Sequence, residues 1–379
     1  MCDVCIIIPG FGYTTIDSRI LRLQPWNYLF QLSLDLKKNY NVCLIPMDTV
    51  FSSELFDQFN IIGLKTSNNI HICKHIFIPV AIGFLTKILR YIEKKRLGRQ
   101  ILYGVLTTPL MDLRILLRNY IVIKRTSTSI AVDSLLYENM LFRLKTKVIN
   151  KKLYKIIVPS TDYKQILEER SIPEEKIVLY YPRISCDEKI SKEKNDNDVF
   201  MLTYFGAFSE ERGVISLLKA FRRIVDNHRI NMVLQLLIRR IGSKNVQQYI
   251  SLPELGQRIR LVHGDLPREK LHQFVSSSDI IILPYRIISS TVPLVFLESL
   301  LIYYDIPVLS TSIPGIKEHI VRYMPYELLL EPNYSVHELA EVILQVLNSN
   351  EILERISYMK KSYARRLCNV INSQSLSLL

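Results

Sequence analysis

The sequence predicts an α/β protein made of two doubly wound domains, each with a parallel sheet between layers of helices. Short apolar, β-branched runs alternate with helix-period stretches along the whole chain, which is the pattern of consecutive βαβ units. A length of 379 residues, of which 48% are hydrophobic, favours two cores over one. The charged stretch CDEKISKEKNDND has no apolar periodicity and marks the boundary between the two halves.

The first domain is expected to span residues 1–185. We expect it to be completed by a helix at the carboxyl end of the chain, residues 360–379. Turn residues bound each apolar run in this half, and helical stretches lie between the runs. The predicted strands are Val4–Ile8, Val42–Ile45, Ile101–Val105, Tyr120–Ile123, Lys155–Val158 and Ile177–Tyr180.

The second domain is expected to span residues 186–359, where the same alternation starts again. Its restart after the charged linker indicates a second Rossmann-like sheet rather than an extension of the first. The predicted strands are Val199–Phe205, Met232–Ile238, Ile259–Val262, Asp279–Leu283, Pro307–Leu309 and Glu327–Leu330.

The cysteines and the start of the chain favour a reduced, cytoplasmic protein. The six cysteines are scattered, and Cys2-x-x-Cys5 has no second pair to complete a zinc site. The opening MCDVCIIIPG runs directly into an apolar strand, so we expect no signal peptide. No apolar run approaches the roughly 20 residues of a membrane-spanning helix.

The charge of the chain indicates anionic partners without choosing among them. A formal net charge of +13 and a pI near 9.3 suit phosphates, lipid headgroups or nucleic acid. A nucleic-acid-binding protein is disfavoured because the chain has no recognisable module and no interleaving of basic and aromatic residues.

Several metal and nucleotide motifs are absent or incomplete. Asp196-Asn197-Asp198 resembles an Asp-x-Asp metal clamp, but it precedes a strand inside a lysine-rich linker, so a solvated loop is the better interpretation. No H-E-x-x-H pair and no G-x-x-x-x-G-K-[ST] loop is present. We therefore expect no metal and no cofactor.

A glycine turn follows the first predicted strand. Gly10, Phe11 and Gly12 stand where a dinucleotide fingerprint would begin, but the third glycine is missing. One interpretation is a tight turn that requires positive φ. The other is a loop that lets a donor approach the backbone at the carboxyl edge of the sheet.

Residues 276–320 contain the most informative pattern. Ser289, Ser290 and Thr291 precede a helix expected to begin near Pro293 and to carry Glu298. Hydroxyls and free N–H groups at a helix start can bind an anion, although the same residues also make an ordinary N-cap. Glu298 is either a solvated helix residue or a carboxylate that accepts hydrogen bonds from hydroxyls.

Four segments, taken in order, resemble the family-four retaining glycosyltransferases of the GT-B fold (glycosyl transferases group 1). The resemblance implies two Rossmann-like domains facing across a cleft that holds a nucleotide-sugar donor. The segments are LYKIIVPSTDYKQILEERSIPEEKIVLYYP, YFG with the following EERG, DLPREKLHQFVSSSDIIILP, and PLVFLESLLIYYDIPVLSTSIPGIKEHI.

The resemblance implies roles for matching residues. Gly206 lies in the family's glycine turn. Arg212 stands where the family has a basic side chain on the donor pyrophosphate, and a cation there would stabilise the charge that develops on the leaving diphosphate. The alternative for Arg212 is a solvated arginine at a helix start. Glu298 matches the second glutamate of the family's E-x7-E pair, which binds the ribose hydroxyls.

The chain departs from the family pattern at several positions. Ser290 replaces the first glutamate of that pair, and Ala207 replaces the basic residue expected after the glycine turn. Arg239, Arg240 or Arg286 is a candidate to supply the missing positive charge, or each is a surface arginine.

Two features of the first half concern the acceptor side. Asp133 is a candidate catalytic group, or equally the cap of a following helix. Within Ile76–Arg99, apolar residues form one helix face and Lys87, Arg90 and Lys94 lie on another. This pattern suits a helix on an anionic membrane surface, or an ordinary domain helix with its apolar face in the core.

The sequence therefore predicts a hexosyltransferase for glycan biosynthesis. The donor would be a UDP- or GDP-sugar, the acceptor a glycan or lipid-linked glycan, and the transfer metal-free with retention. We expect a cytoplasmic protein with peripheral contact to the inner face of the membrane. The alternative is a degenerate GT-B-like protein that binds a nucleotide sugar or a partner without catalysis.

Overall fold

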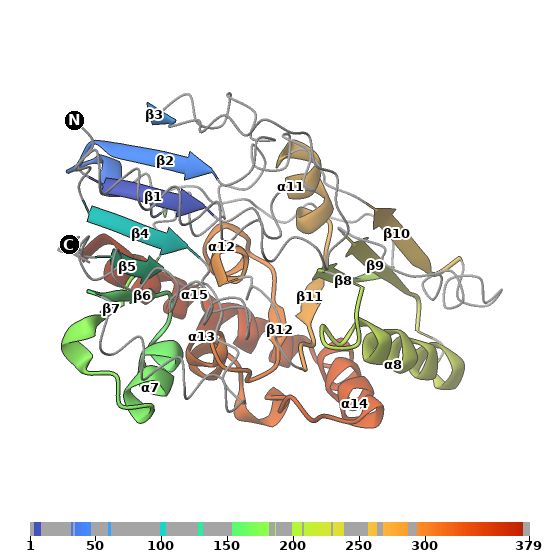
Figure 1. The fold of residues 1–379 in the computed structure, drawn as a ribbon. Coiled ribbons are helices and arrows are strands. Elements are labelled where there is room, and N and C mark those ends of the chain that lie inside the picture. The colour runs from blue at the N-terminus through green and yellow to red at the C-terminus, as the bar shows by residue number, and fades with distance from the viewer. Residues whose placement is uncertain are drawn as a thin grey trace, which may run out of the picture. The chain divides into compact units, whose positions relative to one another are not determined.

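The computed structural model contains two compact units (Figure 1). The first is built from Met1–Arg183, Ser290–Leu294 and Gln374–Leu379, and the second from Ile184–Ser289 and Val295–Ser373. The sequence-based boundary at residues 185 and 186 lies two residues from this division. The structure describes residues 4–8, 32, 35–46, 60–61, 99–103, 128–131, 154–181, 186, 199–206, 208–228, 230–238, 257–263, 268–286 and 294–373.

The first unit contains a parallel sheet whose described strands follow the order β3-β2-β1-β4-β5-β6-β7. Neighbouring strands pair in parallel throughout. The order reverses between β1 and β4, as in a doubly wound sheet. The strands are β1 (Val4–Ile8), β2 (Val42–Pro46), β3 (Asn60–Ile61), β4 (Arg99–Tyr103), β5 (Thr128–Ala131), β6 (Ile156–Val158) and β7 (Ile177–Leu179).

The strand-serine-helix passage of the first unit folds as the sequence predicts. β6 is fully buried, and α7 (Thr161–Glu169) begins after Ser160, whose Oγ accepts a hydrogen bond from the Tyr163 backbone N–H at 3.2 Å. The serine thereby caps the helix and fixes where it starts. A short 3-10 helix, Glu174–Lys176, then leads into β7.

The second unit has a parallel sheet in the order β10-β9-β8-β11-β12. The order reverses between β8 and β11, so this sheet is also doubly wound. The combination of two such units confirms the predicted fold class. The strands are β8 (Phe200–Gly206), β9 (Met232–Ile238), β10 (Ile259–His263), β11 (Ile280–Leu283) and β12 (Val308–Ser310).

Helices cover the second sheet, and the carboxyl-terminal helix belongs to this unit. α8 packs against α14, and α15 packs against α13 and α14 (Figure 1). We expected residues 360–379 to complete the first unit; of these, residues 360–373 lie in α15 of the second unit, and Gln374–Leu379 are grouped with the first. The helices are α8 (Val214–Asn227), α11 (Arg268–Ser276), α12 (Leu294–Tyr303), α13 (Lys317–Tyr323), α14 (Val336–Leu347) and α15 (Asn350–Ser373).

Most of the predicted strands in the described residues are confirmed to within two residues at each end. One is wrong, because Tyr326–Leu328 forms a 3-10 helix after Pro325 and only Leu330 makes a bridge, to Thr311. The short strand β3 and the strand β5 were not predicted. The expected strand Tyr120–Ile123 and nearly all of the proposed membrane helix Ile76–Arg99 lie outside the described residues.

The fold pairs two cysteines that sequence spacing does not relate. Cys186 and Cys368 form a disulfide across 182 residues of sequence, with a Cα–Cα distance of 6.0 Å. This finding corrects the expectation that the cysteines are reduced. Among the described helices, none has both the length and the apolar composition needed to cross a membrane.

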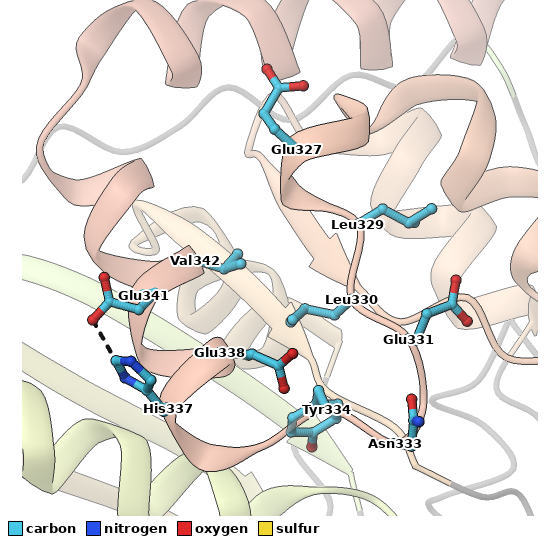
Figure 2. Close-up of a pocket in the computed structure, with 10 residues that line it drawn as sticks. All are labelled: Glu327, Leu329, Leu330, Glu331, Asn333, Tyr334, His337, Glu338, Glu341 and Val342. Atoms are coloured by element: carbon cyan, nitrogen blue, oxygen red, sulfur yellow. Dashed lines mark ion pairs between the residues drawn. The ribbon is translucent and has the colours of Figure 1, made fainter.

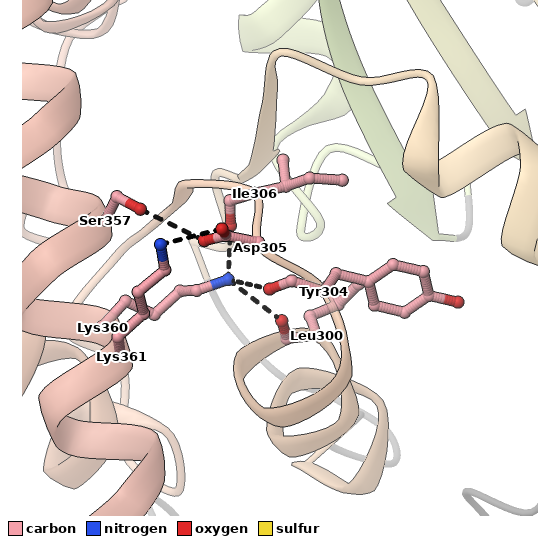
Figure 3. A network of polar contacts seen from close by, with 7 residues as sticks. All are labelled: Leu300, Tyr304, Asp305, Ile306, Ser357, Lys360 and Lys361. Atoms are coloured by element: carbon pink, nitrogen blue, oxygen red, sulfur yellow. Dashed lines mark hydrogen bonds and ion pairs between the residues drawn. The ribbon is translucent and has the colours of Figure 1, made fainter. Parts of the chain in front are cut away.

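A buried lysine ties α15 to the end of α12. Lys360 is 1% exposed, and its Nζ donates to the carbonyl oxygens of Leu300 at 3.4 Å, Ile306 at 2.6 Å and Tyr304 (Figure 3). The carbonyls at the end of a helix lack intrahelical partners, so the Lys360 amino group satisfies them. Burial lowers the pKa of Lys360 to about 7. Beside it, Lys361 forms an ion pair with Asp305 at 2.8 Å.

Lys360→Met is expected to lower the free energy of unfolding by about 3 kcal/mol, because buried carbonyls would lose their donor. Urea denaturation at constant pH measures this change. Lys361→Met is the matched control, since it removes an ion pair whose side chains are 53% and 46% exposed and should cost less than about 1 kcal/mol. Equal losses in the two variants would contradict the assigned capping role.

Candidate functional site

Two loops lie together at the switch point of the second sheet, where the strand order reverses between β8 and β11. The loop after β8 contains residues 208–213, and the segment after β11 contains Pro284–Arg286. The Arg286 backbone N–H donates to the Glu211 carbonyl oxygen at 2.9 Å, which joins the two. In open α/β sheets, ligands bind outside the carboxyl ends of strands at such a reversal of strand order, so this edge is the candidate site.

Gly213 allows the two loops to approach closely. Its φ is +71°, and a Cβ atom there would lie 1.7 Å from the Pro284 carbonyl oxygen and 2.5 Å from the Tyr334 hydroxyl oxygen. That hydroxyl donates to the same carbonyl at 2.6 Å. Only glycine fits both the conformation and the space. The next residue, Val214, begins α8.

The close approach of Gly213 to Pro284 places the preceding residue, Arg212, at the carboxyl edge of the sheet. Its guanidinium carbon lies 5.1 Å from the centre of the Tyr285 ring, and its side chain is half-buried. Burial raises the pKa of Tyr285 to about 12, so the ring remains a neutral phenol that attracts the cation through its π face. The ring orients the positive charge without carrying a compensating negative charge.

Arg286, one of the candidates for extra positive charge, is held by structural contacts. Its Nε donates to Ser216 Oγ at 3.1 Å, and its Nη2 donates to the Tyr334 carbonyl oxygen at 2.8 Å. The guanidinium also lies 4.4 Å from the centre of the Tyr334 ring. Through these contacts, Arg286 connects α8 to the segment that precedes α14.

Glu298 is a completely buried carboxyl group on α12. Its relative exposure is 0%, and neither side-chain oxygen has a hydrogen-bond partner among the described residues. Burial, followed by the neighbouring charge of Glu318, raises the pKa of Glu298 well above its usual value. His319 Nε2 lies 3.5 Å from Glu298 Oε1. The assignment of Glu298 to the donor ribose stays a prediction.

Residues 185–363 match the family model of Glycosyl transferases group 1. This part of the chain is a glycosyl transferases group 1 domain. Its match covers the second sheet, the switch-point loops and most of α15. With this domain and the two-unit GT-B fold, the protein is a nucleotide-sugar-dependent glycosyltransferase. No curated protein matches the chain.

Solved glycosyltransferases show the same fold over the full length. HepE of Anabaena in complex with UDP-glucose superposes with a TM-score of 0.70 at 12% identity, covering 100% of both chains. Sucrose-phosphate synthase of Thermosynechococcus elongatus gives 0.65 at 13%, covering 98% and 96%. The lipopolysaccharide outer core galactosyltransferase WaaB gives 0.60 at 14%, covering 98% and 99%. At these identities the likeness concerns the fold alone.

A groove elsewhere on the glycosyltransferase domain has the wrong charge for a nucleotide diphosphate. It has a volume of about 410 Å³ and lies between the segment 327–334 and α14 (Figure 2). Four glutamates line it, and each has a local partner. Glu338 caps α14 with Ser335, and Glu341 lies 3.6 Å from His337. Glu327 pairs with Arg355, and Glu331 accepts a hydrogen bond from Ser312 Oγ at 2.8 Å. Carboxylates would repel the donor phosphates, so the switch-point edge is the better candidate.

The structure brings together only part of the predicted donor site. Gly206 ends β8, where a Cβ atom would lie 2.6 Å from the Tyr204 hydroxyl oxygen, and Arg212 follows in the next loop. Sequence reasoning missed Tyr285 and Tyr334, which orient Arg212 and the loop, because aromatic residues carry no motif. The predicted residues Gly10, Phe11, Gly12, Asp133, Ser289, Ser290 and Thr291, and also Arg239 and Arg240, lie outside the described residues.

Gly213→Ala is expected to destabilise the second unit by at least about 2 kcal/mol, because the methyl group requires a left-handed backbone and overlaps a carbonyl oxygen. Thermal and urea unfolding measure the loss. Glu210→Ala, at an exposed position of the same loop, serves as the control and should stay within about 0.5 kcal/mol of the parent protein. An unchanged stability of Gly213→Ala would show that the two loops do not approach as described.

Proposed function

We propose that the enzyme transfers a hexose-type sugar from a UDP-sugar to a glycan or lipid-linked acceptor, with retention and without a metal. The observation that carries the proposal is the placement of Arg212 at the switch point of the glycosyl transferases group 1 domain. Uridine is preferred to guanosine because HepE, a GT-B structure similar to this chain, is described in complex with UDP-glucose. WaaB, described as a galactosyltransferase, supports a hexose.

Arg212 would act on the leaving diphosphate. Negative charge develops there as the bond between the sugar and the phosphate breaks, and a cation oriented in advance stabilises it. The ring of Tyr285 holds the guanidinium in place before the donor arrives, which lowers the cost of organising the site. Such a cation takes the electrostatic role that a divalent metal has in other transferases.

Retention follows from the family-four resemblance. In that class the leaving phosphate can itself help to deprotonate the acceptor, so a protein nucleophile is not required. Asp133 remains the proposed polar group on the acceptor side, and Gly10, Phe11, Gly12, Ser289, Ser290 and Thr291 remain proposed donor contacts.

The acceptor proposal rests on charge and on the similar structures. A net charge of +13 favours an anionic surface or acceptor, and WaaB is described as a transferase of the lipopolysaccharide outer core. We propose that the enzyme works in the cytoplasm, with Ile76–Arg99 contacting the inner face of the membrane. A vesicle-binding assay with and without anionic lipid addresses this point.

Arg212→Ala is expected to weaken UDP binding about tenfold or more, because a hydrogen bond to a charged group contributes about 1.5–3 kcal/mol. Isothermal titration calorimetry and thermal shift, without added metal, compare UDP, GDP and their sugar conjugates. Arg222→Ala is the matched control: it removes the same charge from α8, at an arginine that is 51% exposed and paired with Asp226. UDP affinity should remain unchanged in this control.

The same titrations separate the candidate functions. Selective UDP binding that is weakened in Arg212→Ala supports the proposed donor site. Selective GDP binding would instead show that the donor base is guanine rather than uracil. Binding without hydrolysis or transfer of any sugar would favour the degenerate, non-catalytic alternative. Absence of nucleotide binding in the parent protein would overturn the proposed site.

Sugar transfer is expected to continue in the presence of EDTA and to yield the donor's anomeric configuration. The physical reason is that Arg212, rather than a metal ion, balances the diphosphate charge. NMR of the product reports the anomeric configuration, and turnover with and without EDTA reports the metal requirement. A loss of activity in EDTA that Mg²⁺ restores would contradict the metal-free proposal.

A further inference from the structure

The disulfide between Cys186 and Cys368 closes the second unit on itself. Cys186 lies near the first residue of that unit, and Cys368 lies near its last, in α15. The two α-carbons are 6.0 Å apart, although 182 residues of sequence separate them. A cross-link that closes so long a loop restricts the unfolded chain and favours the folded state. The bond therefore contributes to the stability of the second unit as a whole.

The disulfide also holds the end of α15. The buried polar contacts of this helix, at Lys360 and Tyr363, lie one to two turns before Cys368. Of the residues after Tyr363 whose side chains the structure describes, only Leu367 and Ile371 are buried. Helix ends with few buried side chains open readily. Loss of the bond would therefore loosen the last turns of α15 first.

The surroundings of the bond favour exchange with thiols. Both cysteines are partly exposed, and thiol–disulfide exchange requires such access. Arg365, an exposed residue one turn before Cys368 on α15, adds positive charge on the same side of the helix. Positive charge stabilises a thiolate, which then leaves more readily when the bond is attacked.

We propose that the Cys186–Cys368 disulfide is a reversible redox switch that controls how firmly α15 is fastened to the start of the second unit. In the cytoplasm, the compartment proposed for this enzyme, disulfides are usually transient and redox-sensing. The reversibility therefore rests on that part of the proposed function, whereas the fastening of α15 does not. Neither depends on the identity of the donor or the acceptor.

The switching step is an exchange with a dithiol. A thiolate of the dithiol attacks the sulfur of Cys186, a mixed disulfide forms, and Cys368 leaves as a thiolate. The second thiol of the dithiol then attacks the mixed disulfide and releases Cys186. The dithiol is oxidised to a disulfide by two electrons, and its two protons pass to the two cysteine thiols. Exchange with a disulfide oxidant reverses the step.

The test measures the full-length protein in its oxidised and reduced forms. Alkylation and peptide mapping locate the bond, and we expect it to open in glutathione buffers within the cytosolic range. Reduction with dithiothreitol should lower the melting temperature by about 5 °C or more, because the closed loop is long. Hydrogen exchange should increase most in residues 364–373. Reoxidation should restore both properties.

Two variants separate the bond from other effects of the reductant. Cys186→Ser combined with Cys368→Ser leaves the other cysteines in place, so it should behave as the reduced protein and no longer respond to dithiothreitol. Arg365→Ala should slow the reduction and leave hydrogen exchange of the oxidised form unchanged. An unchanged rate of reduction in this variant would overturn the role assigned to its charge.

The outcomes distinguish the switch from the proposed sugar transfer. Free thiols at Cys186 and Cys368 in the oxidised parent protein overturn the proposal. A bond that persists in the most reducing cytosolic buffers is a permanent cross-link, and this result overturns the switch. The proposal also falls if reduction changes neither the melting temperature nor the hydrogen exchange of α15. In each case the proposed transfer stands, because UDP binding and turnover are measured separately.

Discussion

The close approach of the backbone at Gly213 to the Pro284 carbonyl oxygen is the constraint on which the candidate site depends. That contact lets the loop after β8 lie against the segment after β11. Tyr334, which precedes α14, adds two hydrogen bonds: its hydroxyl donates to the Pro284 carbonyl oxygen, and its own carbonyl oxygen accepts from Arg286. These packing contacts therefore position the two loops. In the proposed mechanism, Arg212 is thereby oriented before the donor diphosphate binds, which is the condition for electrostatic stabilisation of a leaving group.

Two buried polar contacts connect α12 to the neighbouring helices of the second unit. The end of this helix is capped by Lys360 from α15, while Glu298 in its middle faces His319. Both connections depend on α15, whose polar residues Lys360 and Tyr363 are one turn apart. Because one helix contacts both the end of α12 and the surroundings of its buried carboxyl group, an altered position of α15 would disturb the packing of α12 at both places.

Sequence reasoning predicted the parts of this protein that depend on local pattern. The parallel strands follow from β-branched periodicity, and α12 begins at Leu294, next to the position expected near Pro293. The disulfide between Cys186 and Cys368 and the cap at Lys360 depend on contacts between residues far apart in sequence, so no spacing rule could reveal them. Tyr326–Leu328 was mistaken for part of a strand because apolar alternation does not reveal a turn fixed by Pro325.

The distribution of charge, rather than its total, favours the switch-point edge over the groove beside α14 as the candidate donor site. A net charge of +13 would suit many anions, yet the groove beside α14 is lined by glutamates. Arg286 is held by a hydrogen bond to Ser216 and by stacking on the Tyr334 ring, whereas Arg212 lies over the ring of Tyr285 at the switch point. Ligands of open α/β sheets bind at this reversal of strand order, so a cation oriented there stands where a diphosphate would arrive. The ring that orients Arg212 is uncharged, and its support therefore fixes the guanidinium in place without adding a negative charge that would repel the donor.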